Sequence, residues 1–551
     1  MKCSMTKGKL FSIIFICLMA ATTSLAGQRT EREMLSVAQR QLSVAAMSRG
    51  KVQALPKVER LLDSEHYCIY GNSEAGFVVV SRNDAYPAVM GYSSTPFDTE
   101  DLPCGMKWWL ETVSSTMQQG TSANRSRAAY QTVEPLVTTT WGQGAPYNFT
   151  TPEIGGSHAP TGCVATAMAQ LMKYYNYPSQ GKGKGYYTRD GNSTHVPENI
   201  STVYEWEKML DSYRGITLTE EIGLPVARLM SDAGIATYMD YGSNSSGALE
   251  FNAARGFVNN FSYELASMRC YQRAFYTDEE WMALLYGELS SRRPVLYCGA
   301  DPAQGGHAFV IDGIDDDGLV HVNWGWDGDY NGFYDIADLN PHDDRYNTNE
   351  HFNESQSMVF GLKAQEEPDA GDHLESLWNM PNQVYTLTGG KKRLSINMPN
   401  TYNYHFLEYT GTLFLVLENL DDKTADKQTF AIGQPNSYIT LYGLSASQMF
   451  LTTKLPAGRY MAYVASKCDT DADYQPVRCK GGIVCYEVTA GADGNNVVSE
   501  ATSMDKLTAV APVTVGSQNT AFAVYDLQGR RVPSSGVKGI YVKNGRKVVA
   551  K

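Results

Sequence analysis

The sequence lacks an excess of basic residues, a dense set of cysteines and, beyond residues 10–21, any long apolar run. Its 46 Lys and Arg are outnumbered by 59 Asp and Glu, which gives a net charge of −13 and a pI near 5.3. This acidic balance argues against binding to nucleic acid or to anionic membranes. Ten cysteines in 551 residues are too few for the disulfide framework typical of small secreted domains.

The one apolar run belongs to an N-terminal leader. Residues 1–9 carry three lysines, residues 10–21 are apolar, and Ser24-Leu25-Ala26 supplies the small residues that a signal peptidase reads. The run is too short and wrongly flanked for a membrane anchor, and Cys17 lacks the small residues that precede a lipoprotein cysteine. We therefore predict a signal peptide over 1–26, no integral membrane span after its removal, and a mature protein outside the cytoplasm.

Length and composition predict several ordinary globular domains. A chain of 551 residues corresponds to three or four domains of about 150 residues each, and 43% hydrophobic with 19% charged residues is typical of globular cores. A polar, basic segment at 120–127 and an acidic one at 365–372 mark boundaries. We expect an α+β domain over 27–129 (helices at 31–47 and 107–119, a strand at 75–81), a second domain over 130–364, a β-sandwich over 373–490 and a final β segment over 503–551.

Cys163 is the first candidate for chemistry. It follows Gly162, and Val164, Met168, Leu171, Met172 and Tyr175 recur at helical spacing behind it. This pattern predicts a tight turn into a helix, with the thiol in the first turn. A helix N-terminus favours the thiolate, which suits a nucleophile, although a buried structural cysteine gives a similar pattern.

A histidine far downstream is the second candidate. His307 follows two glycines and begins a predicted strand over 307–313, and Asn323 lies at the end of a second predicted strand over 319–324. In such a hairpin the Asn323 amide is placed to orient the imidazole, so that Cys163, His307 and Asn323 form the thiol version of nucleophile, base and orienter. His158 lies nearer to Cys163 in the sequence, but its loop gives it no fixed orientation, and we expect it to be structural.

Four segments together resemble the streptopain family (family C10) of papain-like cysteine peptidases. They occur in family order between about residues 133 and 362. They are Trp141-Gly142-Gln143-Gly144-Ala145-Pro146-Tyr147-Asn148, His158-Ala159-Pro160-Thr161-Gly162-Cys163-Val164-Ala165-Thr166-Ala167, Gly306-His307-Ala308-Phe309-Val310-Ile311-Asp312-Gly313 and His321-Val322-Asn323-Trp324-Gly325-Trp326.

The resemblance implies a papain-like fold for 130–364 and a role for each matching residue. Cys163 corresponds to the nucleophile, His307 to the general base and acid, and Gln143 to a donor of the oxyanion hole. Trp324 and Trp326 match tryptophans that flank the histidine, and Asn323 fits the orienter position. No cofactor is implied beyond a reduced thiol.

The flanking regions carry resemblances of their own. Residues 27–129 resemble the inhibitory propeptide of streptopain-like enzymes, which implies that the chain's own propeptide blocks the cleft until the linker at 120–127 is cut. Residues 523–549 are β-runs with a hairpin signal at Asn544-Gly545, and they resemble the C-terminal sorting domain of the type IX secretion system. That similarity implies contact with the type IX machinery and delivery to the medium or cell surface of a Gram-negative bacterium.

A possible metal loop follows the second tryptophan. The residues from Asp327 to Asp338 (Asp327, Asp329, Asn331, Asp335, Asp338) have the ligand spacing of an EF-hand, with aspartate at the last position where glutamate is usual. The family resemblance predicts a turn and a strand here instead. We therefore favour a solvated loop over a calcium site.

The sequence as a whole predicts a secreted cysteine endopeptidase, made as a zymogen and acting on protein or peptide substrates through a thioacyl-enzyme. Two alternatives remain. A thiol acyltransferase or amidase uses the same Cys–His pair, and only its substrate separates it from a peptidase. A catalytically silent surface adhesin would retain the fold, but the set of Cys163, His307 and Gln143 argues against it.

Overall fold

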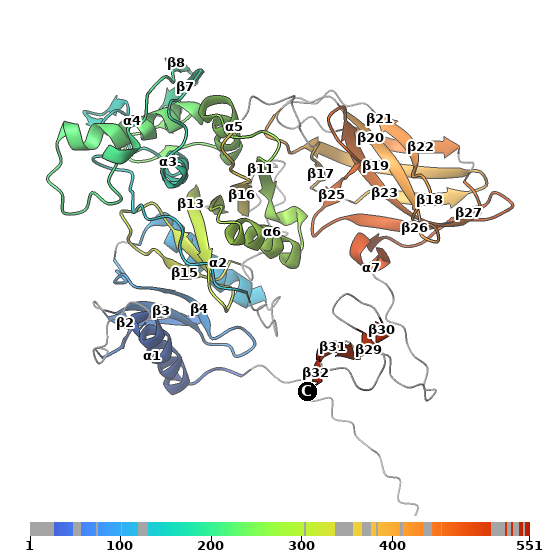
Figure 1. Ribbon diagram of the computed structural model, residues 1–551, viewed down its shortest axis with the longest axis horizontal. Coiled ribbons are helices and arrows are strands. Elements are labelled where there is room, and N and C mark those ends of the chain that lie inside the picture. The colour runs from blue at the N-terminus through green and yellow to red at the C-terminus, as the bar shows by residue number, and fades with distance from the viewer. Residues whose placement is uncertain are drawn as a thin grey trace, which may run out of the picture. The chain divides into compact units, whose positions relative to one another are not determined.

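The computed structural model describes residues 27–47, 57–72, 75–100, 102–119, 130–301, 305–336, 356–365, 376–381, 384–407, 411–433, 444–452, 455–508, 524–525, 531–532, 539–543 and 546–550. The predicted signal peptide (1–26) and the linker at 120–127 lie outside these residues. The chain divides into two compact units, Met1–Ser503 and Met504–Lys551. The first unit contains both helices and strands up to α6 (Asp278–Ser290) and, within the described residues, strands alone from there to Ser503, which fits the expected α+β class (Figure 1).

The N-terminal region forms a helix on a four-stranded sheet, followed by a second helix. Its elements are α1 (Glu31–Met47), β1 (Glu59–Asp63), β2 (Tyr67–Asn72), β3 (Gly76–Ser81), β4 (Val89–Ser93) and α2 (Cys104–Gln119). Alternate residues of β3 serve two cores: Val78 and Val80 pack with Met34, Ala38 and Leu42 of α1, whereas Phe77 and Val79 join the main core. The helix predicted at 31–47 is confirmed, and the one predicted at 107–119 begins three residues earlier.

The middle of the chain is built on antiparallel strands with helices on both faces. The strands are β11 (Arg269–Gln272), β12 (Val295–Asp301), β13 (Gly305–Ile314), β14 (Val320–Asn323), β15 (Gly332–Tyr334) and β16 (Gln356–Phe360). The main helices are α3 (Cys163–Tyr175), α4 (Glu220–Ala236), α5 (Glu250–Phe261) and α6 (Asp278–Ser290), with short η1 (Trp206–Lys208) and η2 (Arg273–Phe275). Small strands complete it: β5 (Glu153–Ile154), β6 (Ser157–His158), β7 (Lys184–Arg189), β8 (Val196–Asn199), β9 (Asp240–Tyr241) and β10 (Ser246–Gly247).

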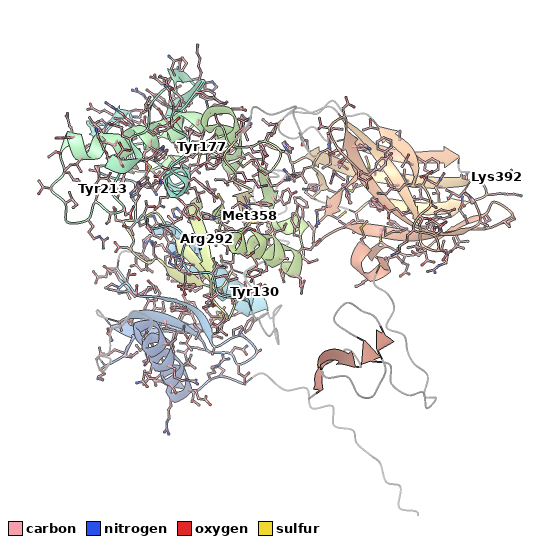
Figure 2. The ribbon with its side chains drawn as sticks, in the orientation of Figure 1. Tyr130, Tyr177, Tyr213, Arg292, Met358 and Lys392 are labelled. Carbon is pink, nitrogen blue, oxygen red and sulfur yellow. The ribbon has the colours of Figure 1, made fainter. Side chains whose placement is uncertain are left out.

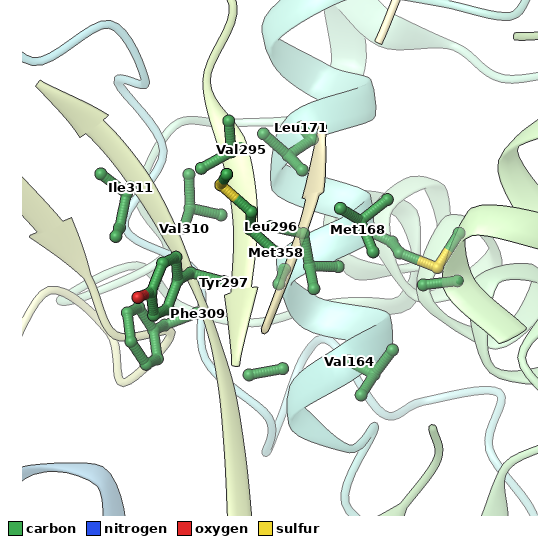
Figure 3. Close-up of a cluster of buried hydrophobic side chains, with 14 of the residues drawn as sticks. Val164, Met168, Leu171, Val295, Leu296, Tyr297, Phe309, Val310, Ile311 and Met358 are labelled. Carbon is green, nitrogen blue, oxygen red and sulfur yellow. The ribbon is translucent and has the colours of Figure 1, made fainter. Parts of the chain in front are cut away.

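Helix α3 packs on one face of this sheet through an apolar cluster. Figure 3 shows Val164, Met168 and Leu171 of α3 together with Leu296, Val310 and Met358 of the strands, all of them buried. The opposite face of the strands carries Tyr297 and Phe309. There the Trp281 indole of α6 donates a hydrogen bond to the Tyr297 hydroxyl at 3.0 Å, and Trp108 of α2 packs against Phe309. The strands are therefore buried on both faces, which fixes their register.

The N-terminal region shares its sheet with the middle of the chain. Ten strands pair in the order β1-β2-β3-β4-β15-β14-β13-β12-β16-β11, and β4 meets β15 with Tyr92 opposite Phe333. Gly332 is required at this seam, because a Cβ there would overlap the Tyr92 carbonyl oxygen. The Trp109 indole of α2 also donates to the Asp335 carbonyl at 2.8 Å. Strand pairing and helix packing together dock the N-terminal region onto the remainder.

Two further β-sheets follow in the same unit (Figure 1). One contains β17 (Trp378–Met380), β18 (Thr386–Gly390), β19 (Arg393–Asn403), β22 (Leu444–Thr452) and β25 (Arg478–Cys479). The other contains β20 (Gly411–Asn419), β21 (Gln428–Gly433), β23 (Gly458–Cys468), β24 (Gln475–Pro476), β26 (Val484–Ala490), β27 (Asn496–Val498) and β28 (Thr502–Ser503). Leu394 and Ile396 of the first sheet and Leu413 and Leu415 of the second share one apolar core. Lys392 forms the turn between β18 and β19 (Figure 2).

These sheets contact the middle of the chain through Arg478. Its guanidinium donates to the Glu280 carboxylate of α6 at 2.9 Å and lies 4.0 Å from the centre of the Tyr276 ring. The same side chain donates to the Phe275 carbonyl at 3.1 Å. Because Arg478 is largely buried, this ion pair is shielded from solvent and orders the seam.

The second unit contains α7 (Met504–Thr508) and a small sheet. Its strands β29 (Val524–Tyr525), β30 (Arg531–Val532), β31 (Gly539–Lys543) and β32 (Arg546–Ala550) pair in the order β30-β29-β31-β32. Lys543 lies opposite Arg546, which is the register expected of a two-residue turn at Asn544-Gly545. Within the part of the chain that the structure describes, no helix is both long and apolar enough to cross a membrane.

Candidate active site

Cys163 is the first residue of α3, as the glycine-led pattern predicted. Gly162 precedes it at φ 85°, where a glycine is favoured, and a Cβ there would lie 2.7 Å from the Met239 sulfur. Cys163 is half-buried, while Val164 to Met172 are buried against the core. The thiol therefore occupies the open start of a helix, whose unpaired N–H groups and positive dipole end favour negative charge.

His307 lies on β13 opposite Gly299 of β12 and is almost fully buried. Its Nε2 lies 2.9 Å from the Trp324 carbonyl oxygen. Since a carbonyl only accepts, Nε2 carries the proton and Nδ1 keeps its lone pair. Burial lowers the pKa of His307 to about 4, and the Trp324 hydrogen bond only partly opposes this shift. At neutral pH the ring is therefore uncharged and able to accept a proton at Nδ1.

The indole rings of Trp324 and Trp326 lie roughly parallel to the His307 imidazole. The Trp326 ring stacks on His307 with 4.6 Å between centroids, and Trp324 and Trp326 are nearly parallel at 5.4 Å. Trp324 is fixed by a hydrogen bond from its indole N–H to the Tyr330 carbonyl at 3.1 Å. The structure thus places both of the expected tryptophans beside the histidine.

The Asn323 amide was expected to orient His307, but its hydrogen bonds go to other residues. Its Nδ2 donates to the Thr139 carbonyl at 2.7 Å and to Gln170 Oε1 at 3.1 Å, and its Oδ1 accepts from the Gly325 N–H. The imidazole instead bonds the carbonyl of the next residue, Trp324. The reason is strand alternation: Asn323 pairs with Val310 and shares its face of the sheet, whereas His307 lies on the face of Phe309. Asn323 thus links the strand end to α3 and the segment before Gln143.

Gln143 lies on a loop that is tied to the start of α3. Its carbonyl accepts the Thr161 N–H at 3.1 Å, two residues before Cys163. Trp141, two residues earlier, donates its N–H to Gln170 Oε1 of α3 at 3.1 Å. The Gln143 side chain is half-exposed, as a group that must reach a bound molecule requires.

Strand β12 lies next to both candidate residues, with Cys298 near Cys163 and Gly299 opposite His307. Cys298 lies beside Gly299, the residue opposite His307, and α3 packs against both β12 and β13. The pKa of Cys298 is raised by burial, and further by the nearby Glu250 and Cys163. His158, by contrast, has its Nδ1 2.6 Å from the Thr151 carbonyl, in keeping with the structural role expected of it.

The acidic series after Trp326 is dispersed among different partners. Asp327 accepts from the Tyr147 hydroxyl, Asp329 pairs with Arg214, and Asn331 accepts the Trp324 N–H. Asp338 lies outside the described residues. Within those residues, no group of three His, Cys, Asp or Glu side chains is arranged to hold a metal ion.

The N-terminal region covers the imidazole, as its resemblance to an inhibitory propeptide implied, and it does so through Gly105, which the sequence did not single out. A Cβ at Gly105, in the first turn of α2, would lie 2.6 Å from His307 Cδ2 and 3.0 Å from the Trp326 ring. Trp108, one turn later, packs on Gly299 in the same way. The helix start is thus in direct contact with His307, and this contact contributes to the burial that lowers its pKa. Within the predicted helix at 107–119, the signal for this contact was the pair Trp108-Trp109.

Acid is expected to destabilise the full chain partly through His307. The unfolded imidazole titrates near pH 6.5 and the buried one near 4, so the unfolded state binds a proton first as the pH falls. The stabilisation present above pH 6.5 is therefore lost down to about pH 4. Between pH 7 and 4.5, His307→Gln should lose less unfolding free energy than the wild type, by roughly 2 kcal/mol. Denaturant titrations of both proteins measure this, and equal losses would contradict it.

Comparison with known proteins identifies two family matches within the chain. Residues 141–334 match the peptidase C10 family, and residues 30–117 match the Spi protease inhibitor family. Streptopain of Streptococcus pyogenes is 35% identical over 305 residues, which cover 51% of this chain and 76% of streptopain. The thiol protease/hemagglutinin PrtT of Porphyromonas gingivalis is 32% identical over 289 residues, which cover 48% of this chain and 33% of PrtT.

A solved structure extends the likeness to the fold. A fragment of Prevotella intermedia prointerpain A is 34% identical, covers 57% of this chain and 99% of its own length, and superposes with a TM-score of 0.50. The chain therefore belongs to the peptidase C10 family of cysteine peptidases and carries a Spi-type inhibitor domain ahead of the peptidase region.

Proposed function

We propose that this chain is a secreted cysteine endopeptidase, made as a zymogen, in which Cys163 is the nucleophile and His307 the general base and acid. The observation that carries the proposal is the packing of α3, which begins at Cys163, against the strand that bears His307. The tie between Gln143 and Thr161 supports an oxyanion site next to the thiol. Membership of a peptidase family favours peptide hydrolysis over acyl transfer to another acceptor.

The chemistry follows from the hydrogen-bonding state of His307. Nδ1 takes the thiol proton of Cys163, and the thiolate attacks the peptide carbonyl carbon to form a C–S bond. The Cys163 N–H and the Gln143 amide donate to the oxyanion. The protonated imidazole then gives its proton to the leaving amine as the C–N bond breaks. A water, deprotonated by Nδ1, releases the acyl group and restores the thiol, so that no cofactor beyond a reduced Cys163 is needed.

Latency follows from the contact between Gly105 and His307. While α2 covers the ring, the imidazole stays dehydrated and its pKa low, which disfavours an ion pair with the Cys163 thiolate. Removal of the propeptide returns water to this face and raises the pKa toward its usual value. Cleavage before Val133 suits this scheme, because Val133 already pairs with Ile314 of β13 and anchors the new N-terminus.

The regions beyond the peptidase are assigned to attachment and export. We assign the sheets at 373–490 to an accessory β-sandwich domain that Arg478 holds against α6. The leader at 1–26 directs secretion, and the strands after residue 503 engage the type IX machinery of a Gram-negative cell. The mature peptidase is then released into the medium or held at the outer surface.

Cys163→Ala is expected to abolish peptide hydrolysis, because no other group replaces the nucleophile. His307→Ala should lower the rate by several orders of magnitude, and Gln143→Ala by roughly 100- to 1,000-fold, the usual loss for one oxyanion donor. Casein hydrolysis, with and without the thiol-directed inhibitor E-64, measures this after removal of the propeptide. Full activity in a folded Cys163→Ala protein would refute the assignment.

Gly105→Ala is expected to shorten the time that the precursor stays inactive. The added methyl group meets His307 and Trp326, so the start of α2 must shift away, although alanine itself favours a helix. Gly287→Ala is the matched control, since a Cβ on that helical glycine meets open space. Hydrolysis of a fluorogenic peptide by freshly purified precursors should begin sooner in Gly105→Ala alone; equal lag times would contradict the contact's role.

Deletion of residues 504–551 is expected to block delivery to the cell surface without impairing catalysis. These residues form a separate unit, and the cut spares Ser503, which pairs with Val484 in the preceding sheet. In the native host the shortened protein should accumulate in the periplasm and retain activity in cell extracts. Cell fractionation decides the matter, and unchanged export of the deletion protein would disprove the sorting role.

A further inference from the structure

The loop that follows Trp324 packs against the segment that carries Gln143. Gly328 lies against Thr140, where a Cβ would be 3.1 Å from the Thr140 Cβ. One residue earlier, the Asp327 carboxylate lies so close to Gly142 that any side chain at Gly142 would overlap it. Two successive residues of one loop thus contact the chain immediately before Gln143.

Tyr147 links the same two segments. Its hydroxyl donates to Asp327 Oδ1 at 3.1 Å. Burial raises the pKa of that hydroxyl, and the nearby Gly142 backbone N–H has a smaller, lowering effect on it. A hydroxyl that donates to a carboxylate has its lone pairs free to face the N–H. Tyr213 packs edge-on against the Tyr147 ring at 5.5 Å between centroids and limits its movement.

Asp327 adopts a backbone conformation that is uncommon for a residue with a side chain. Its φ is 52°, in the left-handed region, and it is flanked by Gly325 and Gly328, which also have positive φ. Burial raises the pKa of its carboxyl group, which the Tyr147 hydrogen bond and Arg214 oppose. A half-buried acid in a left-handed conformation is retained only where its contacts outweigh the cost.

We propose that Asp327 is a positioning residue that fixes the Gly142–Gln143 backbone through Tyr147 and thereby aims the Gln143 amide at the oxyanion. This inference rests on the proposed role of Gln143. Asp327 directly follows Trp326, which stacks on His307, so a single loop sets both the proton-transfer group and the oxyanion donor. An oxyanion donor acts only when it is held in place before charge develops, so loss of the carboxylate lowers kcat more than it changes KM.

The test compares Asp327→Ala, Asp327→Gly and Asp327→Asn in the full chain after maturation, with active sites counted by E-64. Asp327→Ala and Asp327→Gly should both lower kcat roughly 10- to 100-fold with KM within about twofold. The glycine variant keeps the left-handed backbone, so its loss isolates the carboxylate contact. Asp327→Asn keeps an oxygen that accepts from Tyr147 and should retain most of the activity. Tyr147→Phe should resemble Asp327→Ala.

A second comparison separates positioning of Gln143 from a general structural effect. In a Gln143→Ala background, Asp327→Ala should lower kcat by less than about twofold, because the donor that it positions is already absent. Asp329→Asn is the matched control, since it removes the exposed ion pair with Arg214 and should leave kcat unchanged. Additive losses from Asp327→Ala and Gln143→Ala, or wild-type kcat in Asp327→Gly, would overturn the positioning role. An active Cys163→Ala protein would instead refute the proposed function itself.

Discussion

The antiparallel register of β12, β13 and β14 against helix α3 is the constraint on which the site depends. It places His307 opposite Gly299. The neighbouring residue, Cys298, lies near Cys163 at the start of α3, which adds to the rise that burial causes in the pKa of the Cys298 thiol. Because the strands are buried on both faces, a slip of one residue would move Phe309 and Val310 to the wrong sides and turn His307 to the other face of the sheet. The hydrophobic core therefore sets the geometry of the candidate active site as well as the stability of the fold.

Inhibition uses the same sheet. Strand β4 of the inhibitor domain pairs with β15, and this docking brings the start of α2 onto His307. Glycine at position 105 allows the helix backbone to approach the ring, and Trp108 fills the space over Gly299. The cost of keeping a histidine dehydrated is offset by the strand pairing and by the apolar contacts of α2, so latency and stability of the precursor arise from one interface.

The segment from Trp324 to Asp327 contacts both His307 and the chain immediately before Gln143. The Trp324 carbonyl bonds the His307 imidazole, and the Trp326 ring stacks on it. The Asp327 carboxylate accepts from the Tyr147 hydroxyl and lies against Gly142, the residue before Gln143. The residues whose spacing resembles a calcium loop have different partners in the structure: Asp327 bonds Tyr147, and Asp329 pairs with Arg214. The spacing of acidic residues in a sequence does not show where their side chains point. In this turn the backbone changes direction at several residues with positive φ, among them Asp327 and Gly328.

The sequence by itself determined the local features: the helix start at Cys163, the strand that bears His307, and α1 at 31–47. Glycines, periodic apolar residues and β-branched runs act over a few residues, so they can be read directly. Only the tertiary structure decided that the Trp324 carbonyl, rather than Asn323, bonds the imidazole, and that Gly105 covers it. These contacts join segments far apart in the chain, and their geometry depends on strand register and side-chain direction, which no local pattern encodes.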